Sequence, residues 1–442
     1  MEFVGREREI EKLRLIEERS HSVAQFTVIS GRRRIGKTEL VKKAYEGNPQ
    51  MLYFFVARKS EVELCRIFIE EMRRKLDVAV PNATFESFAD VFRFVMDIAQ
   101  RQHITLFIDE FQDFFKINPS IYSDMQNIWD SGKRGASINL VVGGSVNTLL
   151  NRIFRDEKEP LFGRQTDSLK LQPFTPSLMK YIASKYFPGQ SPADFLALYA
   201  ITGGVAKYVE LFVDRQDSTL DKMLSTIFEA DSYFLTEGKV LLIEEFGKDY
   251  GVYFSILTAI AEGKNTRSEI EDQLGTDAIS GHLSRLMDDY ELISKLQPIH
   301  EASANKNVHY AIRDPFLRFW FRFVYKYWHV IEANGHRSLK LKVAESFPTF
   351  SGLALEHYFR EVLKETGQYT RLGYWHDRKG NNEIDIVAED EFGERLELIE
   401  VKRSERNIDL SILRSKGDAY LKAVNRYKGY RISYRGLSLE NM

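Results

Sequence analysis

The segment from Phe26 to Tyr45 constrains the fold of this chain more than any other. An apolar, β-branched run, Phe26-Thr-Val-Ile-Ser30, leads into Gly31-Arg-Arg-Arg-Ile-Gly-Lys-Thr38, and a helical pattern follows from Glu39. This is the G-x-x-x-x-G-K-T sequence of phosphate-binding loops, in its required place between a strand and a helix. Glycines let the backbone wrap closely around phosphates, and exposed N–H groups with the helix dipole supply positive potential. The segment therefore predicts a nucleotide site.

Two side chains of this loop have specific expected roles. Lys37 would reach the β- and γ-phosphates of ATP, and the Thr38 hydroxyl would hold Mg²⁺. Other nucleotide contacts are expected from the loop and the first helical turn, at Gly31, Ile35, Gly36 and Glu39. The alternative is a glycine-bounded basic turn that binds no ligand.

Two further apolar strands end in polar residues suited to the same site. The strand Ile104-Thr-Leu-Phe-Ile108 ends in Asp109-Glu110, and Ile138-Asn-Leu-Val-Val142 leads into Gly143-Gly-Ser145. Acids at the carboxyl end of a parallel strand lie where the metal and the attacking water need an anion. We expect Asp109 to hold Mg²⁺ through its water shell, and Glu110 to polarise the water. Ser145 is either a γ-phosphate sensor or an ordinary turn residue.

Taken together, these motifs resemble a known family. The stretches "FVGREREI", "IDEFQD", "GGSVNTLL" and "PLFGRQTDSLKLQPF" look like the archaeal-type ATPase family, of the STAND/AAA+ kind, over about the first 240 residues. The resemblance implies a RecA-like parallel sheet with a small helical lid. It implies an adenine contact near Val4, Gly5 and Arg6. It also implies a basic residue near the phosphates, for which Arg164 is the candidate and an ordinary salt bridge the alternative.

The lid departs from the pattern of that family at one position. Members usually carry Gly-Gly-x-Pro-x-Tyr there, whereas this chain has Gly203-Gly-Val-Ala-Lys-Tyr208. The missing proline puts in question whether the lid senses nucleotide in the usual way.

The middle of the chain predicts a winged helix-turn-helix. Three short helices are expected, the second opened by a capping box, and a wing with a polar turn follows. The segments are, in order, 253–262, 266–269 for the capping box, 277–290, 293–312 for the wing and 305–307 for its turn. The third helix exposes Arg285 and His282 but also Asp288 and Asp289, which is a poor face for phosphates. An interaction or spacer role is therefore favoured over reading of DNA.

Residues 314–328 form the most aromatic stretch, "DPFLRFWFRFVYKYW". Its basic residues, Arg318, Arg322 and Lys326, recur at helical spacing and so share one stripe. Aromatic and basic side chains together suit single-stranded nucleic acid, whereas the simpler interpretation is a helix buried between domains. The string also resembles the region that follows the ATPase in many members of the family, ahead of a nuclease-like domain.

The segment from Asn381 to Ser404 predicts two strands joined by a turn around Phe392-Gly393. Successive strand residues point to opposite faces, so Glu400 and Lys402 share a face on one strand, as do Glu383 and Asp385 on the other. Charges on such apolar strands are costly unless they bind each other, a metal or a substrate. Upstream, Glu356 lies on an amphipathic helix that could reach the same edge.

Helical Glu, then Asp, then Glu-x-Lys resembles the PD-(D/E)xK nucleases, and "EIDIVA" with "LIEVK" resembles their Holliday-junction-resolvase branch. The resemblance implies that Glu356, Asp385 and Glu400 gather Mg²⁺ beside a scissile phosphate, and that Lys402 is catalytic. Basic residues further on would hold the DNA backbone: Arg403, Arg406, Arg414 and Lys416. The alternative is a β-hairpin with a Glu–Lys pair on its edge.

The composition of the whole chain limits its possible partners and location. With 62 basic and 64 acidic residues the net charge is −2, so any nucleic-acid surface must be local, such as the tail from Lys402. A single cysteine, Cys65, and the absence of a leader or an apolar run of spanning length predict a cytoplasmic protein with no membrane partner.

We therefore expect an α/β architecture in five parts. These are a P-loop ATPase core (1–175), a helical lid (176–248), a winged helix-turn-helix (249–312), an aromatic linker helix (313–345) and a restriction-endonuclease-like domain (346–442). The expected function is ATP hydrolysis that acts on DNA, structure-specifically and with homo-oligomerisation left open, and the last domain would cut the DNA with Mg²⁺. The rival is a non-cutting, STAND-type nucleotide switch whose last domain only binds DNA or a partner.

Overall fold

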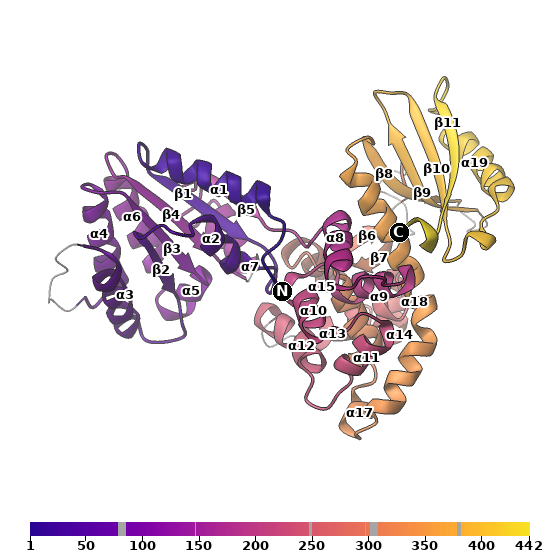
Figure 1. Ribbon diagram of the computed structural model, residues 1–442, viewed down its shortest axis with the longest axis horizontal. Coiled ribbons are helices and arrows are strands. Elements are labelled where there is room, and N and C mark those ends of the chain that lie inside the picture. Colours follow the sequence, from indigo (N-terminus) through magenta and orange to yellow (C-terminus); the bar gives the residue numbers. More distant parts are fainter. Residues whose placement is uncertain (78–84, 146, 247–249, 297, 301–307, 378–381) are drawn as a thin grey trace. The chain divides into compact units, whose positions relative to one another are not determined.

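The computed structural model describes residues 1–77, 85–145, 147–246, 250–296, 298–300, 308–377 and 382–442. The chain divides into two compact units (Figure 1). One comprises Glu2–Gln172, and the other comprises Pro173–Met442 together with Met1. The predicted end of the ATPase core at residue 175 lies close to this division.

The first unit is built on a five-stranded parallel sheet with the strand order β2-β3-β4-β1-β5. Its strands are β1 (Gln25–Ser30), β2 (Met51–Phe55), β3 (Ile104–Asp109), β4 (Ile138–Gly143) and β5 (Asp167–Lys170). The central strands β3 and β4 are buried along their whole length, as expected for a parallel sheet covered on both faces. The phosphate loop follows β1, and the acidic pair lies at the end of β3. Strand β4 lies between these two strands.

Helices cover both faces of this sheet. They are α1 (Glu7–Ser20), α2 (Lys37–Ala44), α3 (Glu61–Lys75), α4 (Phe88–Ala99), η1 (Phe111–Asp113), α5 (Phe114–Ile117), α6 (Ile121–Gly132) and α7 (Asn147–Arg155). Alternate strand residues such as Phe26 and Val28 enter one large core with α3, α4 and α6. The intervening residues face α1 and α2, where polar groups such as Asn139 are also buried. The alternation follows from the two-residue period of a strand.

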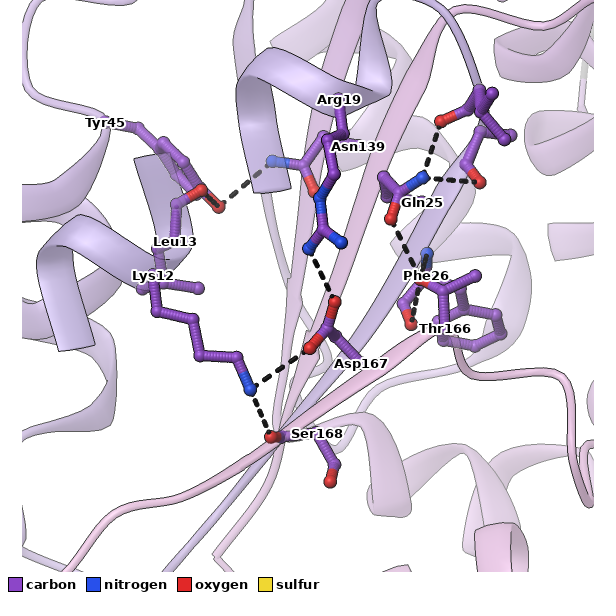
Figure 2. Close-up of polar contacts among 12 residues, drawn as sticks. Lys12, Leu13, Arg19, Gln25, Phe26, Tyr45, Asn139, Thr166, Asp167 and Ser168 are labelled. Carbon is purple, nitrogen blue, oxygen red and sulfur yellow. Dashed lines mark hydrogen bonds and ion pairs between the residues drawn. The ribbon is translucent and has the colours of Figure 1, made fainter. Parts of the chain in front are cut away.

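The short edge strand β5 is attached to the sheet by side chains of α1 (Figure 2). Asp167 forms ion pairs with Lys12 at 3.0 Å and with Arg19 at 2.8 Å. Lys12 also donates a hydrogen bond to the Ser168 carbonyl at 3.0 Å. Just before the strand, Thr166 accepts a hydrogen bond of 2.9 Å from the N–H of Phe26. The start of β5 therefore lies beside the start of β1.

The second unit opens with helices and a small hairpin. They are α8 (Pro176–Tyr186), α9 (Pro192–Thr202), α10 (Ala206–Arg215), α11 (Leu220–Ile227), α12 (Tyr233–Phe246), α13 (Tyr250–Ala261), α14 (Arg267–Leu274), α15 (Ser280–Ser284), the π-type turn η3 (Arg285–Asp289), β6 (Ile293–Leu296) and β7 (His309–Ile312). The capping box predicted at Thr266 and Glu269 is confirmed. Helices α13 to α15 precede the antiparallel pair β6–β7, in the order expected of a winged helix. The turn predicted at residues 305–307 lies outside the described residues.

The aromatic stretch is a buried helical segment. It comprises α16 (Pro315–Phe319), η4 (Trp320–Tyr325) and α17 (Trp328–Glu332). Trp320 is 1% exposed and donates its indole N–H to the Leu235 carbonyl at 3.0 Å. Gly238 makes this approach possible, because a Cβ there would lie 2.2 Å from the Trp320 ring. The geometry agrees with the buried-helix interpretation.

The chain ends in a four-stranded sheet of order β11-β10-β9-β8 (Figure 1). Its elements are α18 (His336–Glu365), β8 (Arg371–His376), β9 (Glu383–Asp390), β10 (Arg395–Val401), η5 (Glu405–Asn407), α19 (Leu410–Val424), β11 (Arg431–Leu437) and η6 (Leu439–Asn441). The predicted hairpin is present as β9 and β10, which pair antiparallel across a turn at Phe392. Helix α19 crosses over to β11, which pairs parallel to β10. The prediction of an α/β domain here is confirmed.

Among the helices that the structure describes, none combines the length and the apolar character needed to cross a membrane.

Candidate functional site

The phosphate loop of the first unit has the backbone conformation that its glycines predict. It follows β1 and ends at Gly36, which precedes the first residue of α2. Gly31 has φ +147° and Gly36 has φ +95°. This region favours glycine, because the Cβ of any other residue would clash with the adjacent backbone. These two glycines therefore allow the backbone conformations by which the loop connects β1 to α2.

Lys37 is the first residue of α2 and is buried. Its ammonium donates to the main-chain oxygens of Gly31 at 2.8 Å and Arg32 at 3.1 Å. Burial lowers the pKa of Lys37 to about 8, against the opposing attraction of Glu110 and Asp109. An ammonium has three N–H donors, so after these two bonds one donor and the whole charge are left for a phosphate.

Thr38 and Asp109 meet at the ends of α2 and β3. The Thr38 hydroxyl donates to Asp109 Oδ2 at 2.6 Å, and the Tyr53 hydroxyl donates to the same oxygen at 3.1 Å. Burial and the Asp109 charge raise the pKa of Tyr53, which therefore keeps its proton. A hydroxyl and a carboxylate side by side are the oxygen donors that Mg²⁺ takes next to nucleotide phosphates. The pair thus fits the predicted metal site.

Glu110 and Ser145 are brought together, as their positions on neighbouring strand ends require. Glu110 Oε2 accepts bonds from the Ser145 hydroxyl at 2.7 Å and from the Gln112 amide at 2.6 Å. Glu110 has φ +53°, so the extended strand conformation ends at this residue. Gly144 packs tightly behind this group, because a Cβ there would lie 2.1 Å from Gln112 Oε1. Ser145 therefore contacts the candidate base, and its role as a phosphate sensor stays a prediction.

The other predicted contacts lie in different environments. Ile35 is buried, whereas the Glu39 side chain is 68% exposed and pairs with Lys42 at 3.5 Å. The nucleotide contact assigned to Glu39 stays a prediction. In the segment Val4-Gly5-Arg6, Arg6 has φ +72° and donates to the Gln172 carbonyl at 2.6 Å, and burial lowers its pKa. The adenine contact assigned to this segment stays a prediction.

Arg164 does not lie at the phosphate loop of its own chain, which corrects the prediction. Its guanidinium pairs with Asp130 at 3.2 Å and donates to the Phe162 carbonyl at 2.8 Å. Asp130 stands near the end of α6, which leads into the start of β4, and Thr166 bonds the start of β1. Arg164 therefore lies at the amino edge of the sheet, whereas the phosphate loop follows the carboxyl edge. The alternative, a salt bridge, is what the structure shows.

A second group of charged side chains lies on the C-terminal sheet. Pairing of β9 with β10 ends at Ile386 and Ile399, so the next residues on the two strands are Asp385 and Glu400. Each of these carboxylates is 7% exposed. Lys402 bridges them, with Nζ 2.7 Å from Glu400 Oε1 and 3.4 Å from Asp385 Oδ2. The structure thus assembles Asp385, Glu400 and Lys402 as the motif predicts.

Electrostatics at this group are those of partly desolvated charges. Asp385 accepts the Val401 N–H at 2.7 Å, yet burial and then Glu400 hold its pKa above the ordinary value. Glu356 on α18 feels Asp385 electrostatically, and burial raises the pKa of Glu356 to about 7. Burial opposes the charge on Lys402, but its bond to Glu400 and the Asp385 charge outweigh it and raise its pKa.

The predicted metal ligands Glu356, Asp385 and Glu400 do not form a ligand cluster. In the described part of the chain, no three His, Cys, Asp or Glu side chains gather as a metal site would require. Ammonium groups neutralise the acids instead, because Lys416 on α19 lies 3.0 Å from Glu400 Oε2 and 3.1 Å from its Oε1.

Lys416 is the residue whose place sequence reasoning missed. The sequence predicts that it contacts the DNA backbone, whereas in the structure it pairs with Glu400. Lys416 is spaced along α19 so that it lies near Gly417 and Tyr420, which are buried on the face toward the sheet. This helical spacing is the signal that could have placed Lys416 beside Glu400. Arg403 donates to the Ser351 hydroxyl, while Arg406 and Arg414 are exposed, as a DNA-facing surface would need.

Comparisons with known proteins agree with the first unit. Residues 3–212 match a family described as an ATPase domain predominantly from Archaea. Residues 320–413 match a family of archaeal and bacterial proteins of unknown function. An uncharacterized protein of Methanocaldococcus jannaschii, MJECL04, is 27% identical over 409 residues, which cover 90% of this chain and 87% of that protein.

Among solved structures, the Walker-type ATPase PABY2304 of Pyrococcus abyssi is similar with a TM-score of 0.54 and 20% identity, over 72% of this chain and 96% of that one. The ORC2 protein of Aeropyrum pernix, solved with ADPNP and ADP, gives a TM-score of 0.49 at 15% identity, over 75% of this chain and 95% of that one.

Proposed function

We propose that this chain binds ATP with Mg²⁺ at Lys37, Thr38 and Asp109 and hydrolyses the γ-phosphate bond, since residues 3–212 match a family described as an ATPase domain. The observation that carries the proposal is the 2.6 Å contact between Thr38 and Asp109, beside the buried Lys37 ammonium. Lys37, Thr38 and Asp109 lie at one edge of the sheet, although β4 separates β1 from β3, and this supports the assignment of a phosphate-binding cation beside metal-binding oxygens.

Each residue has a part that follows from its position. Lys37 offers its charge to the phosphates, and Thr38 and Asp109 would hold Mg²⁺, which neutralises charge on the β- and γ-phosphates when bound. Glu110, held by Ser145 and Gln112, accepts hydrogen bonds and so orients its carboxylate. A carboxylate so held can take the proton of an attacking water.

Phosphate release from ATP tests this assignment. Wild type should release phosphate in the presence of Mg²⁺, and Lys37→Ala should bind ATP at least tenfold more weakly. Glu110→Gln should bind ATP with little change and lose hydrolysis by 100-fold or more, because it removes the base but no phosphate contact. Phosphate release that persists in Lys37→Ala would place the reaction elsewhere.

We also propose that the C-terminal sheet acts on DNA as a PD-(D/E)xK-type nuclease domain. Two observations support it. The order of elements is a helix, three antiparallel strands, a helix and a parallel strand. At the end of the second and third strands, Asp385, Glu400 and Lys402 lie within ion-pair distance.

The carboxylate oxygens of Asp385 and Glu400 fit Mg²⁺ only if their ion pairs with the lysines break. Asp385 and Glu400 would hold the metal, which polarises the scissile phosphate and lowers the pKa of water when bound. Lys402 would stay beside the phosphate as a positive charge, and the exposed Arg406 and Arg414 would contact the backbone of the strand.

The remaining parts of the second unit are assigned by their order. We assign α8 to α12 to a helical lid and α13 to β7 to a winged helix that serves as a spacer. A cytoplasmic location belongs to the same proposal, because the single buried Cys65 suits a reducing compartment. Assembly of several copies is part of the proposal as well.

One observation favours the rival function, a nucleotide switch that does not cut. Lys402 and Lys416 already neutralise the two carboxylates, as they would in a site that is kept for structure or for binding. A salt-bridged site of this kind needs no metal.

Nicking assays separate the two. Branched and linear DNA are incubated with Mg²⁺, ATP and either wild type, Asp385→Ala or the exposed control Asp418→Ala. Cutting by wild type and Asp418→Ala but not by Asp385→Ala supports the nuclease. No cutting of any substrate by wild type, with ATP hydrolysis intact, removes the nuclease and leaves the switch.

A further inference from the structure

The second unit contains a cavity that no step of the proposed function uses. Its volume is about 690 Å³, and it lies among α9, the hairpin β6–β7, α16, α18 and the sheet strands β8 and β9. The residues on which its chemistry depends are His309, Arg318, Glu356, Arg360, Tyr374 and His376. Cavities of roughly 300–1,000 Å³ are the size that holds small ligands.

Among the described residues, two guanidinium groups of the wall have no carboxylate within ion-pair distance. Arg318 donates to the Phe350 carbonyl at 2.7 Å and stacks 4.7 Å over the Phe350 ring, and burial lowers the pKa of Arg318 to about 10. Arg360 makes one long bond of 3.5 Å to the Asp385 carbonyl, and its buried Nε–H has no partner among the described residues. Neither is in an ion pair within the described ranges.

Largely buried guanidinium groups without counter-ions are costly. A guanidinium has five N–H donors, so most of those of Arg318 and Arg360 stay available after the bonds just described. The planar array of donors matches the paired oxygens of a phosphate. An anion of that kind would supply the missing partner for both.

Another part of the lining is aromatic. The rings of Tyr374 and His376 on β8 lie 5.9 Å apart at 32°, and His376 meets His309 of β7 edge-on at 6.0 Å. His309 Nδ1 donates to Asn265 Oδ1 at 2.9 Å and His376 Nδ1 donates to the Asp377 carbonyl at 2.9 Å, since both oxygens only accept. Since Nδ1 of each ring is already bonded, Nε2 and a ring face are left for a ligand.

The wall holds equal numbers of arginine and glutamate side chains. Three arginines, including Arg313, face three glutamates, including Glu361 and Glu383. Glu356 is the most buried of these acids, and burial raises its pKa to about 7. The Glu356 carboxyl also interacts electrostatically with both Arg318 and Arg360.

We propose that this cavity binds a single nucleotide, with its phosphate on Arg318 and Arg360 and its base against Tyr374 and His376. The nucleotide is either a free mononucleotide or one unit of a strand unstacked beside Asp385, whose carbonyl Arg360 contacts. The site belongs to the second unit and is distinct from the ATP site at Lys37, so it stands even if ATP hydrolysis there is disproved.

Calorimetric titration of the full-length Lys37→Ala protein tests the proposal, because that change weakens binding at the phosphate loop. The probes are AMP, CMP, inorganic phosphate and a short single-stranded oligothymidylate. The variants, each in the Lys37→Ala background, are Arg360→Met, Tyr374→Leu and the matched control Arg337→Met, an exposed arginine of the same helix α18. Circular dichroism and the melting temperature report whether each variant folds.

A mononucleotide or the oligonucleotide should bind the Lys37→Ala and Arg337→Met proteins alike and bind Arg360→Met at least tenfold more weakly. Tyr374→Leu should weaken the nucleotides but not inorganic phosphate. Binding of mononucleotides identifies a free ligand, and binding of the oligonucleotide alone identifies a strand. The proposal is overturned if no probe binds, if folded Arg360→Met binds as tightly as the control, or if phosphate alone binds as tightly as any nucleotide.

Discussion

The hydroxyl of Thr38 donates a hydrogen bond of 2.6 Å to Asp109 Oδ2. This contact joins the first turn of α2 to the end of β3 across the intervening strand β4. The two oxygens come from segments 71 residues apart in sequence, yet they lie within the span of one metal ion. The proposed metal–nucleotide site depends on their closeness.

Thr38→Val should separate metal-dependent from metal-independent binding. Valine keeps the branched shape but removes the hydroxyl, so the phosphate loop should fold while one oxygen ligand is lost. We expect ATP hydrolysis to fall 100-fold or more, with ATP binding in EDTA changed less than threefold. Phosphate release and equilibrium binding with and without Mg²⁺ measure both. An exposed serine on α6, changed as Ser131→Ala, should behave as wild type, and Mg²⁺-stimulated hydrolysis retained in Thr38→Val would contradict the assignment.

The pKa of Lys37 predicts how ATP affinity depends on pH. Burial lowers this pKa to about 8, so the ammonium of the nucleotide-free protein loses its proton as the pH rises through that value. Bound phosphates need the charged form, so binding must take up a proton above pH 8, and affinity should fall by up to about tenfold per pH unit there. Titrations from pH 7 to 9.5 at constant ionic strength measure it. Lys37→Met should bind weakly with a flat profile, and a flat wild-type profile would show that Lys37 does not contact the phosphates.

Gly144 should tolerate no side chain. A Cβ at this position would lie 2.1 Å from Gln112 Oε1 and 2.9 Å from the Leu150 side chain. Gly144→Ala should therefore destabilise the first unit by about 1–3 kcal/mol and slow ATP hydrolysis, because Gln112 also holds Glu110. Denaturant unfolding and phosphate release are the measurements. Gly352→Ala on α18 is the control, where a Cβ meets nothing within 4 Å and alanine favours the helix. Equal stability of the two variants would disprove the tight contact.

The parts that the sequence predicted well are those whose chemistry is local. The phosphate loop lies between its own strand and helix, and the β9–β10 hairpin closes on the turn at Phe392. Asp109 and Glu110 are placed by the strand that they end. In each case a few consecutive residues specify both the backbone and the direction of the side chain, so no distant partner had to be known.

Errors arose where a side chain is held by a partner far along the chain. Arg164 pairs with Asp130, 34 residues away, and the sequence does not show which edge of the sheet it reaches. Lys416 meets Glu400 because α19 crosses over the sheet, which depends on strand order. Motif spacing likewise gave no sign of the cavity at Arg360, since its wall comes from several elements.

Glu356→Gln should stabilise the protein most at alkaline pH. Burial raises the pKa of Glu356 from an ordinary 4.5 to about 7, so the folded state binds a proton that the unfolded state releases. This contribution is fully present below pH 4.5 and is lost as the pH rises through 7. Glutamine is neutral at every pH, so the variant should gain about 2–3 kcal/mol over wild type at pH 8 and nothing at pH 4.5. Unfolding free energies from pH 5 to 8 measure the difference. Glu345→Gln, at a side chain of the same helix that is 76% exposed, should match wild type throughout. A Glu356→Gln protein less stable than wild type at pH 8 would mean that the carboxylate is held charged, as a metal or an arginine ligand would hold it.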